Sequence, residues 1–222
     1  MPETDVRPPG RPAFAPWDRR ELPGLFSVED SARRVGNYRW TEMRLFAALG
    51  GWIATIPELD VKLSMGRHCF HHAFAADLWT KRLPELREMD PERKSVPPNE
   101  AWVTFMAKLT EPEAPGLTIE KLVGVYRVLL PHMLAVYNFH KSATSKITDA
   151  PTIRSLKFAI ADIVDEIMEG EAFLYTLVRA PEHVERAMRQ QGELAGLLLQ
   201  AGGIAGPDSI GVTVGEYLGE DG

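Results

Sequence analysis

Acidic and imidazole side chains stand at core-facing positions of the sequence, where they could form a metal centre or an acid–base centre. Glu42 is the clearest case, because it completes an apolar stripe of helical spacing between Tyr38 and Leu45. Burying an unpaired carboxylate costs several kcal/mol or forces it to take up a proton. We therefore expect a cation, a metal ion or a hydrogen-bond network beside Glu42.

Histidines on the following segment are the candidate partners of Glu42. His72 lies on the apolar stripe of that segment, and His68 lies one turn earlier on an adjoining strip. Glu42 precedes the turn at Pro57 by about fifteen residues and His72 follows it by about fifteen, so antiparallel helices of equal rise bring the two to one level. Of His68, His71 and His72, at least one must face outward.

The second half of the chain supplies a weaker set of the same residue types. Counted from the turn near Asp149, His132 falls within about one turn of the level of Glu166. Glu166 borders an apolar stripe, and Asp162 and Glu169 lie on the same side but farther out. The candidate catalytic residues are Glu42, His72 and Glu166. The candidate metal ligands are Glu42, His68, His72, His132, Asp162, Glu166 and Glu169.

Each candidate also has an ordinary structural explanation, which the sequence leaves open. Glu42 could be a surface partner of a nearby arginine or lysine, and a core histidine is often simply hydrogen-bonded. The acidic run over residues 162–171 is also typical of a solvated helix face. We expect Cys69, Tyr126 and Tyr137 to be packing residues.

Apolar periodicity places these residues on long helices and predicts no strand. The predicted helices span residues 27–56, 59–86, 118–146, 152–179 and 181–200. Pro131 predicts a kink in the third helix. A proline-rich crossover, residues 89–116, separates the first two helices from the next two and contains one short helical piece. The expected fold is all-α: a four-helix bundle of two antiparallel hairpins joined by a crossover, with a C-terminal helix added.

The ends of the chain differ in composition from this helical domain, which we place at residues 27–201. Residues 1–26 are rich in proline and are predicted to form an extended arm. Residues 202–222 are rich in glycine and acidic residues, which predicts a flexible tail.

Composition argues against several other classes of protein. The 222 residues carry a net charge of -6, without the clustered basic residues that a nucleic-acid-binding protein needs. The single cysteine cannot form an internal disulfide and the start of the chain has no signal-peptide pattern, so we expect a cytoplasmic protein. No stretch approaches the roughly 20 uninterrupted apolar residues of a membrane helix, so we expect no membrane association.

The helix order and part of the acidic pattern resemble the ferritin-like superfamily, and in broad layout the non-haem di-iron oxygenases. Asp165, Glu166 and Glu169 stand where that family usually carries Asp-Glu-x-x-His on its fourth helix. Each hairpin of the family contributes a Glu and a Glu-x-x-His pair to two metal ions. The resemblance covers about residues 27–179.

The chain departs from the family pattern at three positions. Its second helix has no Glu-x-x-His, because Cys69 stands three residues before His72. Glu169 replaces the histidine of the fourth-helix motif, and His132 stands where the third helix would carry a glutamate. A single metal, an altered pair of metals and a metal-free descendant are therefore all compatible with the sequence.

The resemblance implies a metal-dependent oxygenase or oxidase that activates O₂ at iron, with one or two ions, and acts on a small organic molecule in the bundle interior. Another divalent metal is an alternative to iron. A second hypothesis is a metal-free cyclase or isomerase that uses the same His and Glu residues as acid and base. A third is a non-catalytic bundle that binds a ligand or partner and could form a homodimer through the fifth helix.

Overall fold

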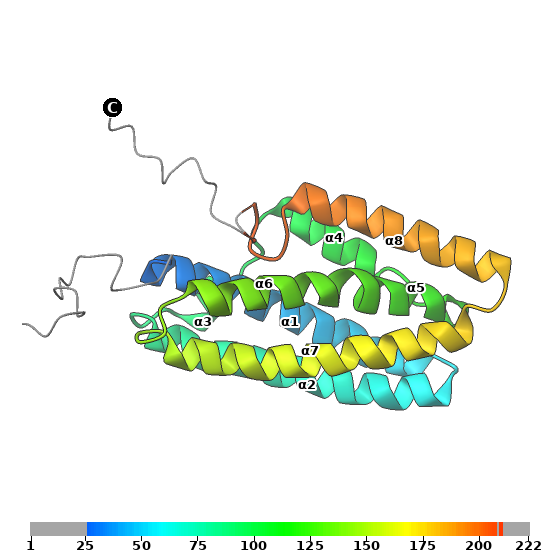
Figure 1. Cartoon of the computed structure of the whole chain (residues 1–222), viewed down its shortest axis with the longest axis horizontal. Coiled ribbons are helices and arrows are strands. Elements are labelled where there is room, and N and C mark those ends of the chain that lie inside the picture. Colours follow the sequence, from blue (N-terminus) through cyan, green and yellow to red (C-terminus); the bar gives the residue numbers. More distant parts are fainter. Residues whose placement is uncertain (1–25, 208, 211–222) are drawn as a thin grey trace, which may run out of the picture.

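The computed structural model describes residues 26–207, 209 and 210, and within this range all regular structure is helical (Figure 1). The prediction of an all-α fold is therefore confirmed for the described residues. The predicted proline-rich arm lies outside them except for Phe26, as does the end of the predicted tail, residues 211–222.

The first two long helices form an antiparallel hairpin. α1 spans Val28–Thr55 and α2 spans Leu59–Glu85, close to the predicted bounds. Ser27 caps α1 in a capping box, because its Oγ accepts from the N–H of Asp30 at 3.0 Å and the Asp30 carboxylate accepts from the N–H of Ser27. Pro57 interrupts the helical pattern between them, and this short turn sets which residues of α1 and α2 face each other.

The third long helix is built from segments of different pitch. It consists of a 3₁₀ turn (Pro115–Leu117), α5 (Thr118–Leu122), a π-helix (Val123–Leu129) and α6 (Leu130–Ala143). We expected a kink at Pro131, and the irregularity is a π-helical turn that ends just before it. Pro131 has no N–H to donate to the preceding turn. The N–H of Leu130 bonds to the carbonyl of Val125, five residues back, as in a π-helix.

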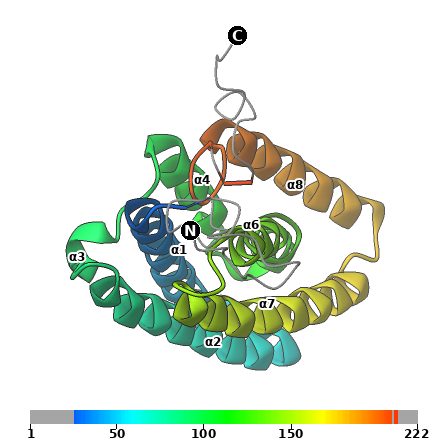
Figure 2. The ribbon, with the colours of Figure 1, turned by 60° about the vertical axis from the view of Figure 1, so that its left-hand side comes forward.

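The remaining helices are α3 (Pro91–Lys94), α4 (Glu100–Thr110), α7 (Ala150–Leu177) and α8 (Pro181–Ala201). Three of these four lie around the third long helix, and the short α3 packs on α1 and α2 instead. α7 packs against both α2 and α6, while α4 and α8 pack on each other and α8 also covers the π-helix. Figure 2 looks nearly along the third helix and shows α1, α4, α7 and α8 arranged around it. The third helix is therefore buried on more than one face.

Large aromatic residues fill the space between these helices. Trp79, Trp102, Tyr38 and Tyr137 have no exposed surface. The central helix is also apolar: Pro115–Ala143 is long and apolar enough to cross a membrane by length and composition, and 61% of its most apolar window is buried inside the protein.

The segment that follows α8 packs on the helical body. Ile204 and Ala205 are buried, and the guanidinium of Arg33 donates to the carbonyl of Ala205 at 2.9 Å. Gly202 and Gly203 both have positive φ, a conformation that glycine adopts without steric cost, and this lets the chain turn back. The first residues of the predicted flexible tail are therefore part of the folded domain.

Candidate functional site

Glu42 and His72 meet inside the first hairpin. Nδ1 of His72 lies 2.6 Å from Oε2 of Glu42, and both side chains are almost completely buried. The prediction that the two residues stand at one level is therefore confirmed. The short distance is that of a charge-assisted hydrogen bond, with the imidazole N–H donating to the carboxylate.

Glu166 of α7 approaches the other side of the same imidazole. Its Oε2 lies 3.0 Å from Nε2 of His72, yet the angles do not form a hydrogen bond, and neither buried atom has another hydrogen-bond partner. Its Oε1 accepts from Nδ1 of His71 at 2.9 Å. Because the His71 side chain is 30% exposed, it links the buried Glu166 to solvent.

Two buried tyrosines complete the arrangement. The hydroxyl of Tyr137, on α6, donates to Oε1 of Glu42 at 2.7 Å. The hydroxyl of Tyr126, on the π-helix, lies 2.6 Å from Nδ1 of His68. We expected both tyrosines only to pack. The role of these tyrosines could have been found from the sequence, because a buried tyrosine hydroxyl usually has a hydrogen-bond partner. Buried carboxylates and imidazoles were expected nearby and could have been those partners.

Tyr126 can lie this close to α7 because residue 170 is a glycine. A Cβ atom built on Gly170 would stand 2.1 Å from Cγ of Tyr126, which no packed structure tolerates. The backbone of α7 thus lies directly against the tyrosine ring, one turn after Glu166. The π-helix and Gly170 together position the Tyr126 hydroxyl over His68.

His68 lies at the edge of this centre. Its Nε2 is 3.2 Å from Oε2 of Glu169, and the guanidinium of Arg67 holds the same oxygen at 2.8 Å. The Glu169 side chain is 40% exposed, whereas that of His68 is 2% exposed. Glu169 therefore closes the centre toward solvent and is only partly inside it.

Electrostatics favour a protonated His72 between ionised carboxylates. Burial alone would lower the pKa of His72, but the charges of Glu166 and Glu42 outweigh it and raise the pKa to about 10. Burial would raise the pKa of Glu166, but His72 and His71 hold it at about 2. At neutral pH we therefore assign a carboxylate–imidazolium–carboxylate arrangement.

The neighbouring groups remain neutral for a different reason. Burial lowers the pKa of His68 despite the nearby carboxylates of Glu166 and Glu169. Burial also raises the pKa of Tyr126 and Tyr137 well above 10, so both hydroxyls keep their protons. These uncharged groups can form hydrogen bonds with the carboxylates and the imidazolium without adding charge to the centre.

One predicted ligand lies elsewhere, and another makes no hydrogen bond to the centre. His132 faces α4 and the segment after α8: its Nε2 accepts from the N–H of Ile204 at 3.0 Å, and its ring lies 6.0 Å from that of Trp102. The prediction that His132 joins Glu166 is therefore wrong, because the central helix has buried faces toward several neighbours. Asp162 is half-buried and accepts no hydrogen bond within the described chain, although its charge raises the pKa of His71.

The donor atoms present fit a metal ion in part. In the described part of the chain, no group of three or more His, Cys, Asp and Glu side chains converges on one point. His72 Nε2 and Glu166 Oε2, however, are buried, lack hydrogen bonds and lie 3.0 Å apart. Adjacent ligands of an octahedral ion with bonds of about 2.1 Å are separated by about 3.0 Å. This pair has the spacing of two neighbouring ligands.

No protein-family model, curated protein or solved structure matches the chain. What the centre can do must therefore be argued from its own atoms.

Proposed function

We propose that His72 and Glu166 bind a divalent metal ion, with iron the first choice, and that the chain is a metal-dependent oxygenase or oxidase on a ferritin-like bundle. Glu42 holds Nδ1 on the opposite side of the His72 ring, so it orients the imidazole and does not bind the same ion. The observation that carries the proposal is the pair of buried donor atoms, Nε2 of His72 and Oε2 of Glu166, that face each other at 3.0 Å without a hydrogen bond. Buried polar atoms without a hydrogen bond are uncommon in folded proteins, and a bound ion or a catalytic role is one explanation for them.

The types of ligand also support this proposal. Imidazole and carboxylate together are typical ligands of non-haem iron, and here they come from two different helices, α2 and α7. Iron would supply the electrons that activate O₂. His68 and Glu169 would complete the set of ligands from the α2–α7 edge.

The surrounding residues have roles that follow from their contacts. The Tyr137 hydroxyl orients the Glu42 carboxylate through a 2.7 Å hydrogen bond. His71 links the Glu166 carboxylate to solvent and provides a route for protons. Trp79 has no exposed surface and helps to exclude water from the centre. The substrate would be a small organic molecule in the apolar interior, and the expected location is the cytoplasm.

Metal binding would compete with protons at His72. A ligating imidazole must be neutral, and the two carboxylates raise the pKa of His72 to about 10. We therefore expect metal binding to release a proton and the affinity to rise with pH. A site without His72 would not show this dependence.

Elemental analysis tests the proposal directly. The protein is purified without chelators, reconstituted anaerobically with Fe²⁺ and freed of unbound ion before metal is measured. We expect bound iron in the native chain and its loss in Glu166→Gln and His72→Gln. Glu171→Gln is the matched control, because Glu171 lies on the same helix but pairs with Arg127 at the surface. Absence of iron, manganese, zinc and copper after reconstitution would overturn the proposal.

One observation favours a second candidate function, metal-free acid–base catalysis. His72 is held between two carboxylates as an imidazolium, and Glu166 is connected to solvent through His71. Such an arrangement can give and take back a proton within an apolar interior, as a cyclase or isomerase requires. Activity that survives chelation but is lost in His72→Gln would establish this function in place of the first.

A further inference from the structure

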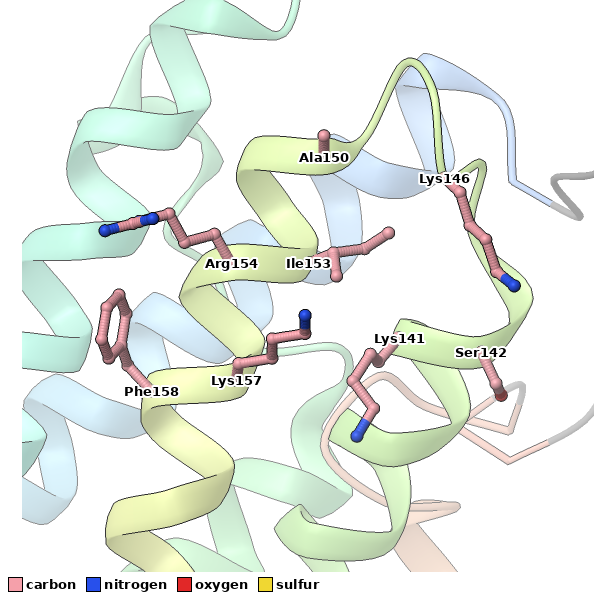
Figure 3. Close-up of a pocket in the computed structure, with 8 residues that line it drawn as sticks. All are labelled: Lys141, Ser142, Lys146, Ala150, Ile153, Arg154, Lys157 and Phe158. Atoms are coloured by element: carbon pink, nitrogen blue, oxygen red, sulfur yellow. The ribbon is translucent and has the colours of Figure 1, made fainter.

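A basic pocket lies at the end of the bundle where α6 turns into α7 (Figure 3). Its volume is about 810 Å³, within the range of about 300–1,000 Å³ that small-molecule sites occupy. The pocket is lined by Lys141, Ser142, Lys146, Ala150, Ile153, Arg154, Lys157 and Phe158. It lies apart from the centre formed by Glu42, His72 and Glu166, so its function can be tested independently.

Four of the eight lining residues are cationic and none is acidic. Within the described chain, none of the four cations forms an ion pair with a carboxylate: Lys141 donates to the amide oxygen of Asn138 at 2.8 Å, and Arg154 lies 5.4 Å from the centre of the Phe158 ring. This concentration of positive charge stands out in a chain with a net charge of -6. Like charges that gather without counter-charges attract an anion.

The nearest acid in the sequence does not neutralise the pocket. Asp149 directly precedes α7, but its carboxylate is occupied by Arg82 at 3.2 Å and by the hydroxyl of Thr144. It therefore does not cap α7 with its side chain. Ala150, the first residue of α7, lines the pocket, so the positive end of the helix dipole adds to the charge of the four side chains.

The cations are spread along the pocket and are not gathered at one point. Figure 3 shows Lys157 on α7 and Lys141 on α6 on either side of the space between the two helices, with Lys146 on the connecting turn. Arg154 and Phe158 extend from the other flank of α7. Phe158 is 43% exposed, and a flat group can stack on the part of its ring that Arg154 and Phe74 leave open.

We propose that this pocket binds a nucleoside polyphosphate, with the phosphates along Lys141, Lys146 and Lys157 and the base near Phe158. Several separated cations suit a di- or triphosphate better than a single phosphate, because each phosphate can meet its own lysine. The exposed ring of Phe158 favours a ligand that carries a base, because the base can stack on the ring. The proposal does not depend on metal binding at His72.

Isothermal titration calorimetry of the full chain with four probes tests the proposal. The probes are ATP, AMP, inorganic phosphate and adenosine, each at low and at physiological salt. We expect ATP to bind more tightly than AMP, AMP more tightly than phosphate, and adenosine not at all. Absence of ATP binding at low salt would overturn the proposal, as would equal affinity for ATP, AMP and inorganic phosphate.

Variants of the pocket distinguish a built site from general attraction to a surface. Lys141→Ala and Lys157→Ala should each weaken ATP binding about tenfold, the effect of losing one charged hydrogen bond. Lys81→Ala is the control, because it removes the same charge from an exposed lysine that pairs with Asp77 on α2. Equal weakening in all three variants would show unspecific attraction and reject the site. Lys81 and Lys157 are exposed and Lys141 is half-buried, so circular dichroism is used to check that all three variants keep the native fold.

Discussion

Nδ1 of His72 lies 2.6 Å from Oε2 of Glu42, although the two residues are 30 positions apart in the chain. The contact joins two long helices at the same level and is buried on all sides. Glu166 approaches the same imidazole from α7. The stability of the bundle and the chemistry of its centre therefore depend on the same ionised groups.

Stability should fall as the pH rises above neutrality. The pKa of His72 is about 10 in the folded protein against an ordinary value of 6.5. The stabilisation that the protonated imidazole gives to the fold is therefore complete below about pH 6.5 and is lost as the pH rises toward 10. We expect the free energy of unfolding to decrease by up to about 3 kcal/mol between pH 6.5 and 9. Urea unfolding at these pH values measures this decrease in the free energy of unfolding. His72→Gln should show little change over the same interval.

Gly170→Ala should destabilise the protein. The carbon of the added methyl group would stand 2.1 Å from Cγ of Tyr126, and overpacking of this kind costs about 1–3 kcal/mol. Gly66→Ala is the matched control, since Gly66 lies within α2 and a Cβ added there would meet nothing within 4 Å. There we expect a small gain of up to about 1 kcal/mol from helix propensity. Thermal unfolding measures the change in stability of both variants. Equal changes would contradict the close contact between Gly170 and the Tyr126 ring.

Tyr137→Phe should lower the free energy of unfolding without creating a cavity. The change removes the hydroxyl that donates to Oε1 of Glu42 and leaves a buried carboxylate oxygen with one donor fewer, at a cost of about 1–3 kcal/mol. Tyr175→Phe is the control, because the Tyr175 side chain is exposed on α7. Denaturant unfolding gives the two free energies. A cost no greater than that of the control would show that the hydrogen bond contributes nothing.

His132→Ala should release the segment after α8 but leave the centre intact. The variant loses the acceptor of the Ile204 N–H, so the amide hydrogen of Ile204 should exchange with solvent faster than in the native protein. Under the proposed metal function, iron binding should be the same in this variant as in the native chain, because His132 lies away from His72 and Glu166. Hydrogen exchange followed by mass spectrometry measures the first effect and elemental analysis the second. Loss of bound metal in His132→Ala would show that His132 is a ligand after all.

The helices and one contact of the centre could be predicted from the order of the residues. The repeat of apolar residues and the capping residue Ser27 define α1, and Pro57 separates it from α2. A helix rises by a constant amount per residue, so counting from a short turn predicts which residues of a hairpin stand level. The contact between Glu42 and His72 could be predicted for this reason.

How the two hairpins meet could not be predicted from local patterns and is seen only in the folded chain. The central helix is surrounded by several neighbours, and periodicity shows that its residues are buried without showing which neighbour each one faces. His132 therefore faces Ile204, while Tyr137, one and a half turns later, reaches Glu42. The π-helix also changes the pitch before Pro131, so distances counted along an ideal α-helix no longer apply across it. Contacts between helices joined by a long crossover depend on packing, which no local pattern in the chain records.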